Sequence, residues 1–348
     1  MLPPQLVNAI IYCSILSLLS LGLSLTYSIT KVPNFAQASF AILGAYTTWT
    51  LVSLSRIGAV KNALLSGANP LEINASVYNY SIPLSVYLEF ILVSFIIVGL
   101  VAVAQYLAVL RPLKRRGGSP TVLMIATIAT DMFIFSVLNI YVDAASSSFL
   151  SAISTLSNQA GYKVPLSIDA RDFTYYSYDL MGKAGVQRAL FIAPILLAAI
   201  LSSLELLLKK TKFGIALRAV VENPNLSGVI GINVELASVA AWFISGGVSG
   251  IAGSLIPLKF YTNTSTGMTL IISIFASSIL GGIGSLYGSV LGAIIIGLSE
   301  TVLLGYITAL TGISSAYRPI IPLLIMTATL MLFPKGLAGI GPLKIKRR

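Results

Sequence analysis

Residues 83–109, PLSVYLEFILVSFIIVGLVAVAQYLAV, form an apolar run in which Glu89 is the one charged side chain. A transmembrane helix needs about 20 mostly apolar residues to cross the hydrocarbon core of a bilayer. This run is long enough, and it therefore indicates a membrane protein. Similar runs cover residues 6–29, 36–56, 120–141, 187–208, 236–258, 268–283, 286–304 and 317–333. Together they predict an all-α polytopic bundle of about nine spans, within a range of eight to ten; the short run 268–283 is either a span or a re-entrant segment.

The composition agrees with this class. Of the 348 residues, 56% are hydrophobic and only 9% are charged, whereas an average soluble domain has roughly 25% charged residues. A soluble fold of this length could not cover its surface with so few charges. No change in composition marks a second domain, so we expect residues 1–348 to form one membrane domain. The first apolar run lacks a basic flank and is long enough to span, so we interpret it as a helix and not as a cleaved signal peptide.

The charges predict the orientation. The net charge is +11, and most basic residues lie in short clusters between apolar runs, unlike the basic face of a soluble nucleic-acid-binding domain. With nine spans one side collects fourteen basic residues against Glu222 and Glu235: Lys31, Arg111, Lys114, Arg115, Arg116, Lys209, Lys210, Lys212, Arg218, Lys335, Lys344, Lys346, Arg347 and Arg348. Cytoplasmic loops carry such an excess. The N-terminus is then outside, the C-terminus is cytoplasmic, and nucleic acid is not an expected partner.

Two long polar segments, residues 57–82 and 142–186, fall on the outer side of this topology and are rich in Ser, Asn, Tyr and Gly. The second is expected to form a small ordered cap from its aromatic residues: Tyr162, Phe173, Tyr175, Tyr176 and Tyr178. Glycosylation sequons start at Asn74, Asn79 and Asn263 on the outer side, but a fourth starts at Asn225 on the inner side. The sequons therefore leave glycosylation open.

Several kinds of chemistry are excluded by missing residues. The chain has no histidine, and its single cysteine, Cys13, lies in the first apolar run. Histidine-based catalysis, an internal disulfide and a cysteine metal site are therefore excluded. The spans also lack a pair of catalytic carboxylates, which argues against an enzyme. No catalytic residues, metal or cofactor are expected.

The connection at residues 211–235, TKFGIALRAVVENPNLSGVIGINVE, is half apolar although it lies between spans. A short amphipathic helix on the membrane face would explain this pattern. Pro224 is expected to break the helix, and Gly228 and Gly231 allow a turn before the next span. Two interpretations stand: a coupling helix that docks into a groove of a cytoplasmic partner, or an interfacial helix without a partner.

Three stretches resemble the branched-chain amino acid permease family of ATP-binding-cassette importers. The family's cytoplasmic loop has a G-x-A-x-R-A run, an acidic residue and a G-I-N, matched here by Gly214, Ala216, Arg218, Ala219, Glu222, Gly231, Ile232 and Asn233. Residues 22–46 resemble its N-terminal helix pair, with N-F-A and L-G-A-Y. Residues 281–292, GGIGSLYGSVLG, resemble its glycine-rich hairpin. The chain departs from the family at Gln37, where histidine or glycine is common, and in the length of 142–186.

The resemblance implies a permease subunit in the plasma membrane that carries branched-chain or related amino acids. It also implies cytoplasmic ATPase subunits, an extracellular solute-binding protein and a second homologous permease, with a heterodimer expected. The ATPase would dock on a coupling loop of about residues 209–235, through Gly214, Arg218, Glu222, Gly228, Gly231 and Asn233. The chain has no phosphate-binding G-x-x-x-x-G-K-[ST] loop, so ATP hydrolysis is expected on a separate chain. Related permeases carry urea or amides, and this substrate class is an alternative.

Three polar residues are candidates for the transport pathway. Asp131 lies near the centre of the run 120–141 and would either meet a substrate ammonium group or hydrogen-bond within the bundle. Asn34 would cap the following helix or contact substrate, and Gln37 follows it. Asp131 is also the one good midplane candidate for an ion-driven secondary transporter, which is the alternative mechanism. The glycine clusters at 246–253 and 281–292 indicate close helix packing, a pathway wall or a subunit interface.

Overall fold

The computed structural model describes residues 4–67, 82–161, 169–175, 185–312, 314, 317–333 and 336–339. Most of these residues are helical, and the described ranges contain no strand apart from one isolated bridge between Phe173 and Thr262. Several residues singled out from the sequence lie outside the described residues: Asn74, Asn79, Tyr162, Tyr176, Tyr178, Lys335, Lys344, Lys346, Arg347 and Arg348.

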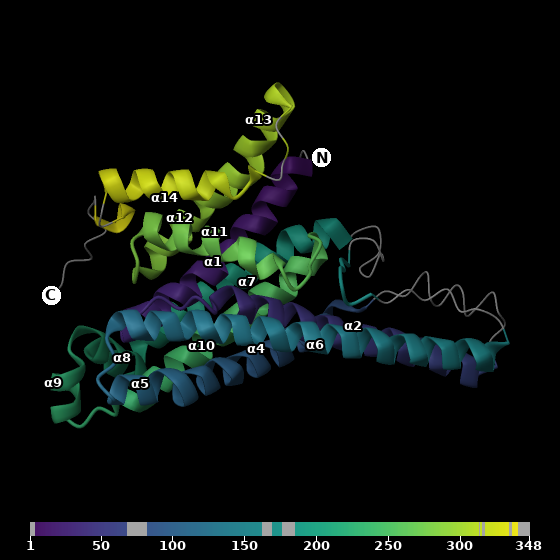
Figure 1. The fold of residues 1–348 in the computed structure, drawn as a ribbon, viewed down its shortest axis with the longest axis horizontal. Helices are drawn as coiled ribbons and strands as arrows, with labels where there is room; N and C mark the ends of the chain where they lie inside the picture. Colours follow the sequence, from purple (N-terminus) through teal and green to yellow (C-terminus); the bar gives the residue numbers. More distant parts are fainter. Residues whose placement is uncertain are drawn as a thin grey trace.

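Each of the nine apolar runs forms a helix (Figure 1). The elements are α1 (Pro4–Thr30), α2 (Gln37–Leu65), α4 (Leu84–Gln105), the π-helical turn η1 (Tyr106–Leu110), α5 (Arg111–Arg115), α6 (Pro120–Ala160), α7 (Gly185–Lys210), α8 (Lys212–Glu222), α9 (Pro224–Val229), α10 (Val234–Leu255), η3 (Ile256–Leu258), α11 (Thr266–Gly281), α12 (Leu286–Leu298), η4 (Ser299–Leu303), α13 (Leu304–Thr311), α14 (Ile320–Leu332) and η6 (Leu337–Gly339). The helix α4 continues through η1 into α5, and α12 continues through η4 into α13.

Seven helices in the described ranges are long and apolar enough to cross a membrane: α1, α4–α5, α6, α7, α10, α12–α13 and α14. Two predicted spans fall outside this set. The helix α2 is long, at 29 residues, but it is less apolar than these seven. The helix α11 has 16 residues, which at 1.5 Å per residue is about 24 Å, short of a bilayer core of about 30 Å. The protein is thus a multi-pass helical bundle, and the count of nine spans stays a prediction.

The centre of the bundle is formed by α1 and α10. We compared an apolar stretch of 18 residues in each helix. In α1, 78% of this stretch is buried and in α10, 72%, whereas in α6, α7 and α14 at most 22% is buried. In a bilayer, small residues let helix backbones approach closely. A Cβ on Gly253 of α10 would lie 1.8 Å from the Ala41 carbonyl oxygen, and one on Gly250 would lie 2.7 Å from that of Ser94. The glycines of α10 therefore serve close packing against α2 and α4.

The glycine-rich hairpin expected within residues 281–292 is present as a tight turn between α11 and α12. Gly282 and Gly284 have φ values of 98° and 89°, which a residue with a side chain rarely adopts. A Cβ on Gly281 would lie 1.9 Å from the Gly288 carbonyl oxygen. Ser285 caps α12 by accepting a hydrogen bond of 3.2 Å from the Gly288 N–H. The hairpin thus needs glycine both for its turn and for its packing.

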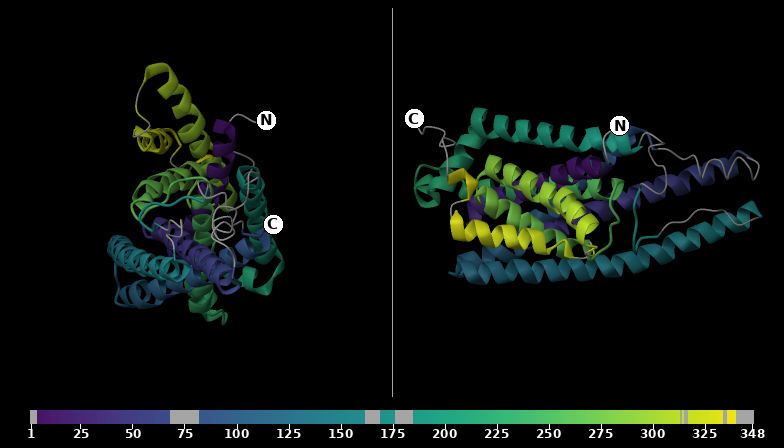
Figure 2. Two further views of the ribbon diagram at one scale, coloured as in Figure 1. Left: turned by 90° about the vertical axis from the view of Figure 1, so that its right-hand side faces the viewer. Right: turned by 90° about the horizontal axis from the view of Figure 1, so that it is seen from above.

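Two helices are longer than the apolar runs predicted. The helix α2 continues past residue 56 to Leu65, and α6 continues past residue 141 to Ala160, so the segments 57–82 and 142–186 begin as helix and not as loop. Together α2 and α6 extend beyond the other helices at one end (Figure 2). The α6 extension packs through Phe149, whose ring centroid lies 5.2 Å from that of Trp49. The serine hydroxyl groups of the extension donate to carbonyl groups of the preceding turn, so these polar residues are accommodated within the helix.

The remaining part of the predicted cap is partly described. Phe173 and Tyr175 are buried. The N–H of Phe173 donates to the Thr262 carbonyl at 3.1 Å, and that of Tyr175 donates to the Pro257 carbonyl at 2.6 Å. The ring of Phe173 lies 5.2 Å from that of Tyr46. These two aromatic residues therefore lie against the end of the bundle, over α2 and the residues that follow η3.

Basic side chains gather at the opposite end, which we call the basic end. It comprises α5, the C-terminal end of α7, and α8 and α9 (Figure 1). Arg111 and Arg115 both form ion pairs with Glu235 at the start of α10. Glu205 and Lys209, near the C-terminal end of α7, also form an ion pair. Two of the basic clusters thus lie at the same end, as the charge count predicted.

Candidate functional site

The predicted coupling loop, residues 209–235, contains two short helices that pack against the bundle, α8 and α9. The hydroxyl oxygen of Thr211 caps α8 by accepting the Gly214 N–H at 3.0 Å. Leu217 and Val220, on one face of α8, are buried in a cluster with residues of two central helices: Leu25, Ile29, Ala237 and Ala241. The predicted amphipathic helix is therefore present, and its apolar face contacts α1 and α10.

Gly214 sets the corner between α7 and α8. It is buried, and a Cβ at this position would lie 2.1 Å from the Leu207 carbonyl oxygen and 2.5 Å from the Leu208 Cα. Both neighbouring atoms belong to the backbone, which cannot rotate away as a flexible side chain can. The position of α8 against the end of α7 therefore requires a residue without a side chain at position 214.

The break at Pro224 is present as predicted. Proline stands at the first position of α9, where it needs no N–H partner. The Asn223 side chain caps α9 by accepting the Leu226 N–H at 3.1 Å. The Asn233 side chain caps α10 by accepting the Leu236 N–H at 2.9 Å. Gly231, with a φ of 87°, makes the turn between them.

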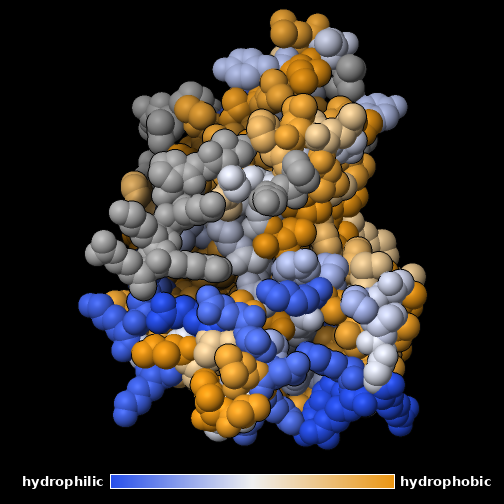
Figure 3. All heavy atoms as spheres, turned by 90° about the vertical axis from the view of Figure 1, so that its left-hand side faces the viewer, coloured by the Kyte–Doolittle hydropathy of each residue, from blue (hydrophilic) through white to orange (hydrophobic). Residues whose placement is uncertain are grey.

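The helix α9 presents a small apolar surface, which we call the α9 tip: Leu226, Val229 and Ile230, exposed to 59%, 83% and 65%. Arg218, Glu222 and Gly228 of the same loop are also exposed. Figure 3 faces the basic end and shows an apolar patch within a largely hydrophilic lower surface. Of the coupling residues named from the sequence, Gly214 is buried and positions the loop, whereas Arg218, Glu222, Gly228, Gly231 and Asn233 are exposed.

Asn34 and Gln37 belong to a buried hydrogen-bond network. The Asn34 Oδ1 accepts the Ala36 N–H at 3.2 Å and the Gln105 Nε2–H at 3.3 Å. The Gln37 Nε2 donates to the Ser249 hydroxyl oxygen at 2.6 Å. Asn34 and Gln37 are each 0% exposed. The network ties the α1–α2 connection to α4 and α10. The prediction that Asn34 caps α2 is wrong, because the N-cap residue of α2 is Ala36 and no side chain caps this helix. Asn34 instead holds the connection through this network, which also includes Gln37.

Asp131 lies apart from this network and is half-buried. Its Oδ1 accepts a hydrogen bond of 2.5 Å from the Ser39 hydroxyl group, which joins α6 to α2. A hydrogen-bonded carboxylate between two helices fits the structural interpretation of this residue.

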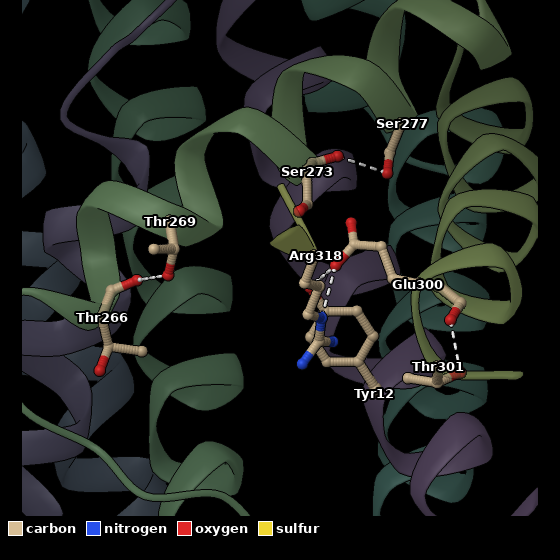
Figure 4. Close-up of polar contacts among 9 residues, drawn as sticks. Tyr12, Thr266, Thr269, Ser273, Ser277, Glu300, Thr301 and Arg318 are labelled. Carbon is tan, nitrogen blue, oxygen red and sulfur yellow. Dashed lines mark hydrogen bonds and ion pairs between the residues drawn. The ribbon is translucent and has the colours of Figure 1, made fainter. Parts of the chain in front are cut away.

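A second polar cluster, which the sequence did not single out as a site, joins Tyr12, Glu300 and Arg318 (Figure 4). The Glu300 Oε2 accepts the Tyr12 hydroxyl group and the Arg318 Nε–H, both at 2.9 Å. The Arg318 guanidinium also lies 4.2 Å from the centre of the Tyr12 ring. The Glu300 side chain is 2% exposed, but that of Arg318 is 34% exposed. The sequence does place one ionisable residue in each of two apolar runs, Glu300 and Arg318. Their contact with each other and with Tyr12 could not be predicted, because Tyr12 lies far away in the sequence.

This cluster borders a cavity of about 320 Å³. The cavity is lined by Tyr12, Ile15, Ile256, Phe260, Tyr261, Thr266, Thr269, Leu270, Ser273, Glu300, Arg318 and Pro319. Two polar atoms of the cluster, the Glu300 Oε1 and the Arg318 Nη2, are buried without a hydrogen-bond partner. The described residues contain no group of His, Cys, Asp and Glu side chains that would hold a metal ion.

Comparisons with known proteins agree with the membrane architecture. Residues 5–330 match the family model described as the permease component of the branched-chain amino acid transport system. The chain is 38% identical to the probable branched-chain amino acid transport permease protein LivH of Methanocaldococcus jannaschii, over 98% of this chain and 93% of that protein. It is 22% identical to the high-affinity branched-chain amino acid transport system permease protein LivH of Escherichia coli K12, over 96% and 94%. No solved structure matches the chain.

The family match covers most of the chain, and the similarity to the first relative is nearly full length. Seven apolar helices among the described residues provide the membrane-spanning body. The protein is accordingly a multi-pass plasma-membrane transport permease, and it belongs to the branched-chain amino acid transport system permease family.

Proposed function

We propose that this chain is the membrane-spanning subunit of an ATP-binding-cassette importer for branched-chain or related amino acids. The names of its relatives give the substrate class, since those proteins are permeases for branched-chain amino acids. ATP hydrolysis is assigned to separate cytoplasmic subunits, and substrate is delivered by an extracellular binding protein. A second, homologous permease completes the pathway as a heterodimer.

The basic end is assigned to the cytoplasm, because cytoplasmic loops carry an excess of Lys and Arg. The N-terminus and the extended ends of α2 and α6 then lie outside, and the C-terminus lies inside. The helices α2 and α11 complete nine membrane segments. The extensions of α2 and α6 are the part of the described structure that reaches farthest outward (Figure 2), so we assign the binding protein to this end.

The observation that carries the proposal is the α9 tip. Val229 is 83% exposed, and its apolar neighbours Leu226 and Ile230 are also exposed, at the basic end of the molecule. A docked partner would bury these side chains at about 25 cal/mol per Å². The tip is held by side-chain caps on both sides, at Asn223 and Asn233. Such a rigid, exposed apolar helix is suited to a groove on an ATPase subunit.

The coupling loop also has a route to the bundle. The helix α8 packs through Leu217 and Val220 on α1 and α10, which are the central helices. A displacement of α9 by an ATPase would therefore act on the two helices that hold the core together. Coupling of this kind requires a free-energy link between the ATPase site and the pathway, and these packed side chains provide a physical one.

The test is co-purification of the importer from native membranes with the Val229→Asp variant. We expect the wild-type chain to bring down an ATPase subunit, and Val229→Asp to lose it, because a carboxylate would be buried in an apolar groove. Leu65→Asp is the matched control, since Leu65 is 77% exposed at the opposite end. Equal recovery of the ATPase with Val229→Asp and with wild type would refute the assignment of the α9 tip.

A further inference from the structure

We propose that the cavity beside Arg318 binds a zwitterionic α-amino acid with an apolar side chain, and that the Arg318 guanidinium holds its carboxylate. The inference rests on the proposed function, because it names the place where the membrane domain itself holds the transported amino acid. The cavity volume of about 320 Å³ falls at the small end of the range for small-molecule sites, about 300–1,000 Å³.

Arg318 is fixed in place before any ligand arrives. Its Nε donates to Glu300 at 2.9 Å, and its guanidinium lies over the Tyr12 ring at 4.2 Å. Its side chain is nevertheless 34% exposed and lines the cavity. A planar guanidinium matches the two oxygen atoms of a carboxylate. Holding it in advance lowers the entropy that binding would otherwise lose.

The charges of the site favour a neutral ligand with separated charges. Glu300 and Arg318 neutralise each other, so an amino-acid zwitterion adds one carboxylate and one ammonium group without a net charge. The free Oε1 of Glu300 is buried and has no partner. Figure 4 shows this oxygen directed toward the part of α11 that carries Ser273 and Ser277. Ser273 adds a hydroxyl group to the cavity wall, and these oxygens are acceptors for an ammonium group.

The remaining wall is apolar and suits a branched aliphatic side chain. It is formed by Ile15, Ile256, Phe260 and Leu270. A purely structural ion pair in a protein interior normally has its polar atoms satisfied, because each unsatisfied buried atom is costly. Two unpartnered atoms of the pair beside a cavity instead fit a site that its ligand completes.

The cavity is linked to the coupling loop by a single helix. Tyr12 and Ile15 of α1 line the cavity, whereas Leu25 and Ile29 of the same helix pack against α8. From residue 12 to residue 25 the helix rises roughly 20 Å. A displacement of α1 at the cavity would therefore be transmitted to the coupling loop, because no flexible segment interrupts this helix.

The test measures protection of a cysteine placed in the cavity. Thr269 is exposed and lines the cavity, and the native Cys13 is buried. The rate at which a charged methanethiosulfonate reagent labels purified Thr269→Cys is measured with L-leucine, with leucinamide and without ligand. Leucinamide keeps the ammonium group and side chain but lacks the carboxylate. Leu310→Cys, at a residue 85% exposed and outside the cavity lining, is the control.

We expect leucine to slow labelling of Thr269→Cys at least fivefold, leucinamide to have little effect, and Leu310→Cys to be unaffected by either. Adding Arg318→Gln should abolish protection by leucine, while the ligand-free labelling rates show that the protein is folded. Absence of protection, equal protection by leucinamide, or protection that survives Arg318→Gln would overturn the proposal. If Arg318→Gln fails to fold, the contrast between leucine and leucinamide decides alone. ATP-driven leucine uptake without protection would overturn this site and leave the proposed function standing.

Discussion

Gly214 offers a sharp test of how the coupling loop works. A Cβ there would lie 2.1 Å from the Leu207 carbonyl oxygen, whereas ordinary contact begins at 3.4 Å. Gly214→Ala must therefore move α8 away from the end of α7 by about 1.3 Å. Overpacking of this kind costs about 1–3 kcal/mol, which corresponds to a factor of about 5–150 in a coupling equilibrium. We expect transport-coupled ATP hydrolysis to fall at least fivefold.

The control for this variant is Gly58→Ala. Gly58 lies in α2, and a Cβ there would have no atom within 4 Å. Alanine is favoured over glycine within a helix by roughly 0.5–1 kcal/mol, so this variant should keep full coupling. The assay is ATP hydrolysis by the reconstituted importer with and without binding protein and leucine. Wild-type stimulation in Gly214→Ala, with the same amount of permease in the membrane, would refute the role given to the α7–α8 corner.

Three further predictions concern the same framework. Glu222→Arg reverses a charge on the exposed part of the coupling loop and should weaken ATPase binding in a salt-dependent way, measured by retention of the ATPase during purification; normal retention and uptake would contradict it. Gly253→Ala should lower the thermal unfolding midpoint in detergent, because its Cβ would meet the α2 backbone, whereas Gly58→Ala should not; equal midpoints would count against close α2–α10 packing. Asn34→Ala should destabilise by about 1–3 kcal/mol, because it leaves the buried Gln105 amide without its acceptor, and an unchanged midpoint would exclude that contact as a stabilising one.

The sequence predicted the helices better than their ends. Apolar length was a sufficient signal for a helix at each of the nine runs, because the bilayer sets a minimum length of apolar helix. It failed where helix continues beyond the membrane. The α6 extension has polar residues that looked like a loop, but Gly161, with a φ of 72°, is what ends the helix. Packing of Phe149 against Trp49 stabilises this extension. No local sequence pattern predicts a contact between residues so far apart.

The coupling loop could be predicted because its signals are local in the sequence, whereas the cavity is formed by residues far apart in the sequence. Its amphipathic pattern, its proline and its glycines lie within one short stretch, so local rules suffice for residues such as Pro224 and Gly231. The cavity is instead lined by residues such as Tyr12 and Glu300, which are hydrogen-bonded to each other but lie 288 residues apart in the sequence. Without the fold, Glu300 was one isolated charge near the end of a span. Only the packing of α1 against η4 shows that it forms an ion pair beside a cavity.

The most direct test of the proposed function is uptake of labelled L-leucine by proteoliposomes that contain the co-purified complex and the binding protein. ATP is supplied on the side of the basic end, and a proton uncoupler is added in parallel. We predict that uptake requires ATP, persists with the uncoupler and is competed by isoleucine and valine but not by urea. Uptake that continues without ATP and collapses with the uncoupler would contradict the proposal and identify an ion-driven transporter instead.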